Sequence, residues 1–372
     1  MMTRHLFPLL ILFCGYAPLF AQAPSPPPDT LIFTNGEKLI GQFEYAHKNT
    51  VTFKSESVGE ISVDWSKIKE LHSSKPFAVI KKGISLGRHS DLSGVPQGTV
   101  AATDKTITLT PASGPPVTIP VASSAHILDV PTFQQDVLHN PGVFEDWRGS
   151  LTAGATVVQA TQQSHAFFGA VNLVRAIPGE SWLDARNRTI FNFNASTGSQ
   201  LQPNTPRIKT EILHSDIERD QYFRGSNLYG FGQASFDHNY SQGLDLQQIY
   251  SGGIGFTAIK KANETLDFKG SISYERQTFQ LPTNNHDLAV SVFAESFARK
   301  FARGIQFIEQ ISGTPAWNAS VYSVAGNAGL TLPVYKRFAF SITALDTYLN
   351  NPPGGFKKNS LQVTTGLTYS LK

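Results

Sequence analysis

Apolar and polar residues alternate at every second position over much of the chain from residue 147 to residue 372. The clearest case is the segment 264–278, whose apolar face is formed by Leu266, Phe268 and Ile272. Charged and hydroxyl side chains occupy the positions between them, and a period of two places the two sets on opposite faces of a β-strand. We expect about twelve such strands, at 147–161, 165–177, 185–197, 207–219, 226–240, 244–260, 264–280, 287–302, 304–312, 317–332, 336–349 and 359–372.

Strands with one apolar and one charged face fit two architectures. In a sandwich the apolar face lies in a dry core, whereas in an outer-membrane barrel it meets lipid and the polar face lines the lumen. An even strand number suits a single-chain barrel with both ends on the periplasmic side. Only 16% of the residues are charged, below the roughly 25% of an average soluble domain. We therefore predict an all-β protein in which a barrel of about twelve antiparallel strands follows two small SH3-like β-rolls.

The first 23 residues have the parts of a secretory signal peptide. Arg4 and His5 precede an apolar run at 6–20, and a small-x-small cleavage site ends at Ala23. The run is shorter than the roughly 20 residues of a spanning helix. The only cysteine, Cys14, lies within this segment, so the mature chain is expected to have no disulfide or thiolate site. We predict export to the cell outer membrane, with a stiff proline-rich spacer at 24–28.

A pattern of short strands occurs twice between the spacer and the barrel, at 29–74 and at 75–130. Each copy has alternating β-branched residues and a glycine-containing turn, and Asn35-Gly36 is a strong tight-turn signal. We interpret 29–130 as a tandem of small periplasmic β-rolls. They either dock a protein or cell-wall partner or act as a spacer that shields the barrel mouth. The linker 131–146 breaks the β pattern and is expected to form a helical turn around 133–138.

Two further sets of residues follow from the predicted barrel. Tyr and Trp near strand ends are typical of the aromatic girdles at the membrane interface. The girdle candidates are Trp147, Trp182, Tyr240, Trp317 and Tyr348. Polar residues that share a strand face are expected to line the lumen. The lumen candidates are Arg186, Arg188, Asn192, Asn194, Asp237, Asp267, Lys269 and Glu275.

Enzymatic and metal chemistry are the competing classes. The neighbours His214-Ser215 and Ser164-His165 would point to opposite faces of a strand, so neither can act as a nucleophile and base pair. His214, Asp216, Glu218 and Asp220 share one face and could bind Ca²⁺, but a hydrated lumen wall paired with Arg and Lys explains them better. We predict no enzyme activity, no metal and no cofactor. The net charge of +3 is small and unclustered, which indicates no nucleic-acid partner.

The segments RDQYF (219–223), NLYGFGQASFDHNYSQGLDL (227–246) and GGIGF (252–256) resemble the DUF481 family, which is similar to salt-induced outer-membrane proteins of the YdiY type. The resemblance spans about 147–372. NGEKLIGQF and GEISVDWSKIKEL look like the small domain that often precedes this barrel. The resemblance implies an outer-membrane β-barrel and transfers no catalytic residue.

The pattern favours a non-enzymatic envelope protein, either a structural barrel or a narrow pore, in contact with outer-membrane lipids. Two alternatives stay open: a solute- or ion-conducting channel resembling a porin, and a secreted soluble β-protein that binds a ligand. Twelve strands lie between the filled interior of eight-stranded barrels and the open channel of sixteen-stranded ones, so strand number does not decide between a pore and a closed barrel.

Overall fold

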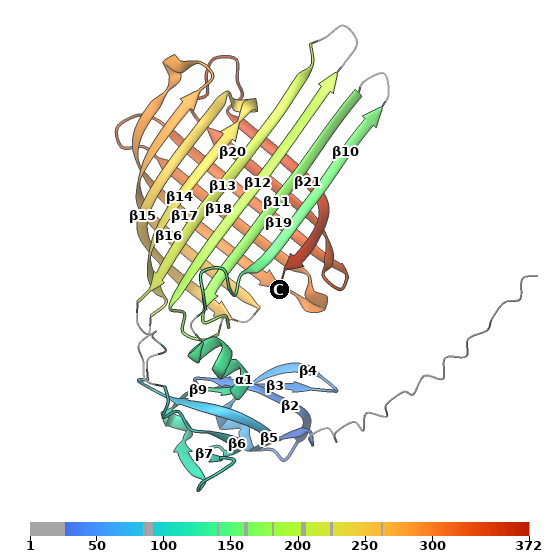
Figure 1. Ribbon diagram of the computed structural model, residues 1–372, viewed down its shortest axis with the longest axis vertical. Helices are drawn as coiled ribbons and strands as arrows, with labels where there is room; N and C mark the ends of the chain where they lie inside the picture. Colours follow the sequence, from blue (N-terminus) through green and yellow to red (C-terminus); the bar gives the residue numbers. More distant parts are fainter. Residues whose placement is uncertain are drawn as a thin grey trace, which may run out of the picture.

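The computed structural model describes residues 27–84, 86, 92–139, 141–159, 163–180, 182–201, 206–223, 226–261 and 263–371. The predicted signal peptide, 1–23, lies outside these residues, as does most of the spacer 24–28. The chain forms a large β-barrel and a smaller N-terminal β-domain, which lies at the same end of the barrel as the C-terminus (Figure 1).

The N-terminal domain is a single sheet of nine strands among the described residues. The pairing order is β4-β3-β2-β1-β5-β6-β7-β8, and β9 pairs with both β2 and β5. Strands β1, β2, β9 and β5 thereby close into a small barrel. The strands are β1 (Asp29–Phe33), β2 (Lys38–His47), β3 (Thr50–Ser55), β4 (Gly59–Asp64), β5 (Ile68–Lys81), β6 (Gln97–Thr103), β7 (Thr106–Thr110), β8 (Val117–Pro120) and β9 (Ser124–Asp129).

The two sequence copies share one core. The expected boundary between residues 74 and 75 falls inside β5, which pairs with β1 of the first copy and with β6 and β9 of the second. Leu31 and Phe53 from the first copy and Ile107 and Ile127 from the second are fully buried in the same cluster. A copy of about 50 residues buries little apolar surface by itself, which favours a shared core. The two predicted rolls therefore form one unit.

The linker forms the short helical segment that the sequence predicted around 133–138. Helix α1 (Val130–Thr132) continues into the π-helix η3 (Phe133–Leu138). The Asp129 side chain caps the start, because its Oδ1 accepts from the Thr132 backbone N–H at 2.9 Å. Phe133 and Val137 are buried on one side of the segment.

The C-terminal part is a closed antiparallel barrel of twelve strands within the described ranges, as predicted (Figure 1). The last strand pairs with the first over residues 149–153 and 367–371, for example at Ala153↔Leu367, which closes the barrel. The strands are β10 (Arg148–Gln159), β11 (Gln163–Ile177), β12 (Asn187–Leu201), β13 (Ile208–Tyr222), β14 (Leu228–Asn239), β15 (Leu244–Lys261), β16 (Glu264–Phe279), β17 (His286–Lys300), β18 (Gln306–Pro315), β19 (Tyr322–Tyr335), β20 (Phe338–Leu349) and β21 (Asn359–Leu371).

The barrel is apolar outside and polar inside. Ile272, Phe293 and Leu361 on the outer face are 65%, 62% and 65% exposed, whereas Glu275 on the inner face of β16 is 2% exposed. This inversion of the usual soluble pattern is what a lipid environment requires. No helix in the described part of the chain has the length and apolar character of a membrane span.

Cysteines placed at Ala153 and Leu367 should form a disulfide that closes the β10–β21 seam. The two residues pair across it. Opposed residues in antiparallel strands have Cα atoms about 4.5–5.5 Å apart, within disulfide reach. The folded band of A153C/L367C on SDS gels should then resist the heat-induced mobility shift until a reductant is added. In the control, A153C/V363C, the second cysteine lies off register, and equally efficient crosslinking there would contradict the observed pairing.

Candidate functional site: the polar lumen

Charge in the lumen is confined to one side of the wall. Away from the strand ends, the charged residues described on the inner face all come from β12, β13, β14 and β16, four of the five consecutive strands from β12 to β16. The inner faces of the described parts of β10, β11 and β17–β21 carry hydroxyl, amide and apolar side chains instead. The lumen is therefore a charged half-wall facing an uncharged one.

The layer nearest the N-terminal domain is organised by Arg188 at the start of β12. Its Nε donates to Asp220 Oδ2 on β13 at 2.7 Å, and its Nη1 donates to Asp267 Oδ2 on β16 at 3.1 Å. Asp267 Oδ1 also accepts from Thr257 Oγ1 at 2.6 Å and from the Tyr229 hydroxyl at 3.3 Å. β12 and β16 are four strands apart in the barrel order, so the Arg188 side chain crosses part of the lumen to reach Asp267. An ion pair that crosses the lumen in this way is called a chord below.

Tyr229 fills the space beneath this chord and is fully buried. Its ring lies where the facing strand has Gly255, at which a Cβ would be 2.2 Å from the ring. Only glycine allows the ring to lie flat against the wall at this point. The Arg188 guanidinium lies 5.4 Å from the ring centroid, which adds a cation–π contact.

A second chord lies one layer further along the lumen. Lys269 on β16 donates to Glu218 Oε1 on β13, and its Nζ lies 5.7 Å from the Phe231 ring. The side chain of Glu218 is 2% exposed and that of Lys269 is 16% exposed. The pair is therefore largely shielded from water, and its partners come from strands that are three apart.

The middle of the lumen contains His214 between two carboxylates. Its Nδ1 lies 2.6 Å from Asp237 Oδ1 and its Nε2 lies 3.0 Å from Asp216 Oδ1. Both ring nitrogens thus face oxygen acceptors, an arrangement that the doubly protonated imidazolium satisfies. Asn192 Nδ2 donates to Asp216 Oδ1 at 3.1 Å.

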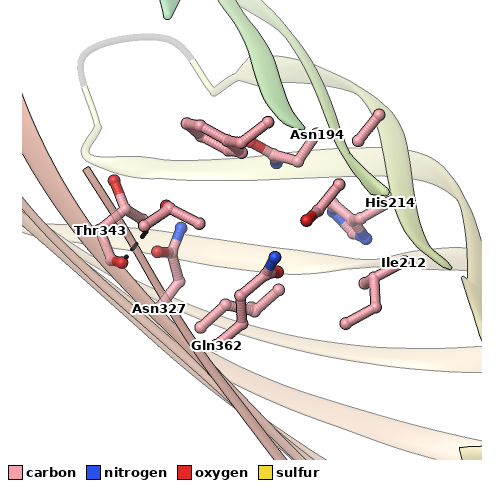
Figure 2. A pocket seen from close by; sticks show the side chains of 11 residues that line it. Asn194, Ile212, His214, Asn327, Thr343 and Gln362 are labelled. Atoms are coloured by element: carbon pink, nitrogen blue, oxygen red, sulfur yellow. Dashed lines mark hydrogen bonds between the residues drawn. The ribbon is translucent and has the colours of Figure 1, made fainter. Parts of the chain in front are cut away.

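A small cavity separates this group from the uncharged half-wall. Its volume is about 30 Å³, enough for a water molecule or two. In Figure 2, Asn194 and His214 lie on one side of the cavity, and Asn327, Thr343 and Gln362 lie on the other. Apart from His214, the lining side chains are uncharged.

The end of the lumen far from the N-terminal domain is crossed by the loop between β20 and β21. Asn351 Nδ2 in this loop donates to Gln277 Oε1 on β16 at 3.3 Å. Gln242, from the turn between β14 and β15, donates to the carbonyl of Lys358 at 2.8 Å. The Gln277 amide in turn donates to Glu275 Oε1 at 2.6 Å. These hydrogen bonds hold the β20–β21 loop against residues of β16 and of the β14–β15 turn on the opposite side of the barrel mouth.

The structure places most of the predicted lumen residues on the inner face. Arg186 differs, since it precedes β12 and its backbone bonds to Ile177 and Tyr222 at the strand ends. The inner-face residues are Arg188, Asn192 and Asn194 on β12, Asp237 on β14, and Asp267, Lys269 and Glu275 on β16.

Two of the carboxylates of β13 have an Arg and a Lys from other strands as their partners. Arg219, on the opposite face of the same strand, points outward and donates to Thr189. The partners of Glu218 and Asp220 are Lys269 and Arg188. Hairpin register could have identified Arg188, because it pairs directly with Asp220. Pairing between neighbouring strands gives no signal for Lys269. Among the described residues, no group of three His, Cys, Asp or Glu side chains is arranged to hold a metal ion.

The girdle candidates fall into two groups. Trp317 and Tyr240 are 59% and 44% exposed near the end far from the N-terminal domain, and Tyr348 stacks on Tyr322 at 5.8 Å. Trp147 is partly buried next to β10, where its Nε1 donates to the Val143 carbonyl at 2.9 Å.

Trp182 requires a correction, because it is 8% exposed and buried in the joint between the barrel and the N-terminal domain. It lies in the turn between β11 and β12, and its ring stacks on Tyr45 of β2 with centroids 4.1 Å apart and planes 4° apart. The next residue, Leu183, is fully buried against Phe133 and Val137 of the linker. A buried ring of this kind cannot contact lipid headgroups.

Ionisable groups surround this joint. His47 Nδ1 lies 3.1 Å from His126 Nδ1, and His126 Nε2 lies 3.8 Å from Asp184 Oδ2 in the barrel turn. Burial, and then the charge of His126, lower the pKa of His47 from 6.5 to about 4. The hydrogen bond with His126 lowers the pKa of Asp184 from 3.8 to about 2. Lys260 Nζ donates to the Leu183 carbonyl at 2.6 Å and adds a cation to the same turn.

Comparison with known proteins identifies a family and a distant fold likeness. The family described as "Protein of unknown function, DUF481" matches residues 151–371. The β domain of the Bordetella autotransporter BrkA is 11% identical, with a TM-score of 0.31, over 61% of this chain and 98% of that chain. The translocator domain of autotransporter NalP from Neisseria meningitidis is 8% identical, with a TM-score of 0.31, over 60% and 87%. A search of curated proteins found no match.

Replacing Arg188 with alanine should lower the free energy of unfolding by about 3–5 kcal/mol, the usual effect of leaving a buried charge unpaired. Asp220 and Asp267 would both lose their cation. The measurement is the urea dependence of the folded band in detergent micelles. The control is Arg299→Ala, which removes an exposed pair with Glu264 at 3.7 Å and should cost less than about 1 kcal/mol. Equal effects would mean that lumen water solvates the two carboxylates.

Acidification from about pH 6.5 to 4 should weaken the joint. The pKa of His47 is lowered to about 4 in the docked state and is near 6.5 when exposed, so the separated state binds the proton first. The docked state therefore loses stability as the pH falls through this window. Protonation of Asp184 then weakens the joint further between about pH 4 and 2, because its docked pKa is about 2.

Trp182 provides the readout for this pH effect. Its fluorescence should shift to the red as the stack on Tyr45 opens, in a variant that lacks the other tryptophans, Trp65, Trp147 and Trp317. His47→Gln should flatten the change above pH 4 and leave the lower step intact. An unchanged profile in that variant would show that another group controls the joint.

Proposed function

Because this chain belongs to the DUF481 family, whose matched region is the barrel, we propose that it is a non-enzymatic outer-membrane protein with a narrow, cation-preferring pore and a periplasmic docking domain. The exposed apolar outer wall supports a membrane location over a secreted soluble protein, since monomeric soluble proteins rarely expose so large an apolar patch. The barrel end that carries both the N-terminal domain and the C-terminus would then face the periplasm (Figure 1).

The observation that carries the pore proposal is the charge imbalance of the lumen. Away from the strand ends, the described inner wall combines six carboxylates with two permanent cations and one histidine. The carboxylates are those of Asp216, Glu218, Asp220, Asp237, Asp267 and Glu275, and the cations are Arg188 and Lys269. A cavity lined by excess negative charge concentrates cations and excludes anions.

The narrowness of the pore is supported at both ends. The chords of Arg188 and Lys269 cross the periplasmic half of the lumen. The loop held by Gln242 and Asn351 crosses the external mouth. Such a lumen would admit small hydrated ions and exclude larger solutes, which favours a narrow pore over a general porin.

The proposed docking role of the N-terminal domain is supported by the way this domain contacts the barrel. Among the described residues, Trp182 and Leu183 in the turn between β11 and β12 pack against the N-terminal domain and the linker. This leaves its far strands, β6, β7 and β8, available to a protein or cell-wall partner.

Planar-bilayer recordings test the pore. The full-length mature protein should give small single-channel steps whose reversal potential in a KCl gradient shows cation preference. The variant Q242A/N351A should release the loop and raise the conductance several-fold. The control is Asn318→Ala, which breaks hydrogen bonds in a different external loop and should leave the conductance unchanged. Absence of steps in both the wild type and the released variant would leave a sealed structural barrel.

A further inference from the structure

One carboxylate oxygen in the periplasmic half of the lumen has no hydrogen-bond partner in the described structure. Asp220 is fully buried, and Arg188 occupies its Oδ2 at 2.7 Å, but its Oδ1 contacts no donor. Leaving a buried acceptor unpaired destabilises the folded state, and more strongly when the acceptor is charged. We therefore expect a bound species beside Asp220 Oδ1.

The neighbouring carboxylate indicates the charge of that occupant. Glu218 lies two residues earlier on the same inner face of β13. Two neighbouring carboxylates that are shielded from water repel each other unless a positive species lies near both. A water molecule could donate to Oδ1 but would leave this repulsion in place.

The surrounding charges limit the occupant to a single positive charge. The layer holds three carboxylates, those of Glu218, Asp220 and Asp267, and two cations, Arg188 and Lys269. One further positive charge makes the layer neutral. A divalent ion would leave an excess positive charge beside a guanidinium and an ammonium group in a poorly hydrated space.

We propose that Glu218 and Asp220 bind one monovalent alkali cation, Na⁺ or K⁺, in the periplasmic half of the lumen. Carboxylate oxygens are the hard ligands that such ions prefer, and a set of two carboxylates suits a weakly held ion that keeps part of its water shell. The site deepens the proposed function and rests on it for the access of cations to the lumen. This site is where a permeating cation would bind on its way through the lumen, and Glu218 and Asp220 are the residues that would select the cation.

The test is the thermal stability of the full-length protein in detergent, read as the midpoint of the folded-to-unfolded band shift. Ionic strength is held constant while NaCl or KCl replaces N-methylglucamine chloride. A ligand that binds only the folded state raises the folding equilibrium constant about tenfold for each tenfold rise in its concentration above Kd. Wild-type protein should show this dependence with Na⁺ or K⁺, and Asp220→Asn should abolish it.

Glu218→Gln serves as a second variant if Asp220→Asn fails to fold, and it should also abolish the dependence. The matched control is Glu295→Gln, which removes a carboxylate from the outer wall beside Phe268 and should retain the wild-type response. The proposal is overturned if N-methylglucamine and the alkali cations give the same midpoints, which would assign the position to a shared proton or to water. It is also overturned if Ca²⁺ stabilises the protein at lower concentrations than Na⁺ and K⁺ do.

These outcomes separate the site from the pore. Cation-dependent stability without single-channel steps would support the site and remove the pore. Cation-preferring conductance without cation-dependent stability would support the pore and remove the site.

Discussion

The interior of this barrel depends on the contact of Arg188 with two buried carboxylates. A twelve-stranded wall encloses more space than its own side chains fill, so buried charges there need partners from distant strands. Arg188 provides this link because its guanidinium has donors in a fork, and it uses them on Asp220 and Asp267 at once. A lysine at this position offers a single charged point and would satisfy one of the two. The planar guanidinium also packs over Tyr229, which fills the space that the chord leaves.

The same strand connects the lumen to the N-terminal domain. Trp182 and Leu183 lie in the turn that leads into β12, and Arg188 begins the lumen-facing row of that strand. The N-terminal domain therefore contacts the barrel a few residues before Arg188. Movement of the domain would act on the start of β12, where the first ion pair of the lumen is made.

The sequence predicted the barrel well because alternation is a local property. Strand number, the inner faces of β12, β14 and β16, and the closing strand all follow from a period of two and from the strand count. The prediction that Trp182 lies in the aromatic girdle was wrong for a physical reason. An aromatic residue near a strand end is equally suited to lipid headgroups and to a domain interface. The sequence pattern of the tandem β-rolls did not predict that both copies share β5. A single strand that pairs with both copies has the same pattern as the last strand of one copy followed by the first strand of the next. The chord from Lys269 to Glu218 joins residues that are never adjacent in the ladder, so no pairing rule reveals it.

The uneven distribution of charge has a structural logic of its own. Ion pairs that cross a lumen stabilise it only where their partners can reach each other, so charges gathered on neighbouring strands can pair across short chords. An uncharged opposite wall leaves those pairs undisturbed and offers hydroxyl and amide groups to water. The small cavity beside His214 and Asn194 lies where the two half-walls meet. A lumen organised in this way is braced by ion pairs on one side and presents hydroxyl and amide groups on the other.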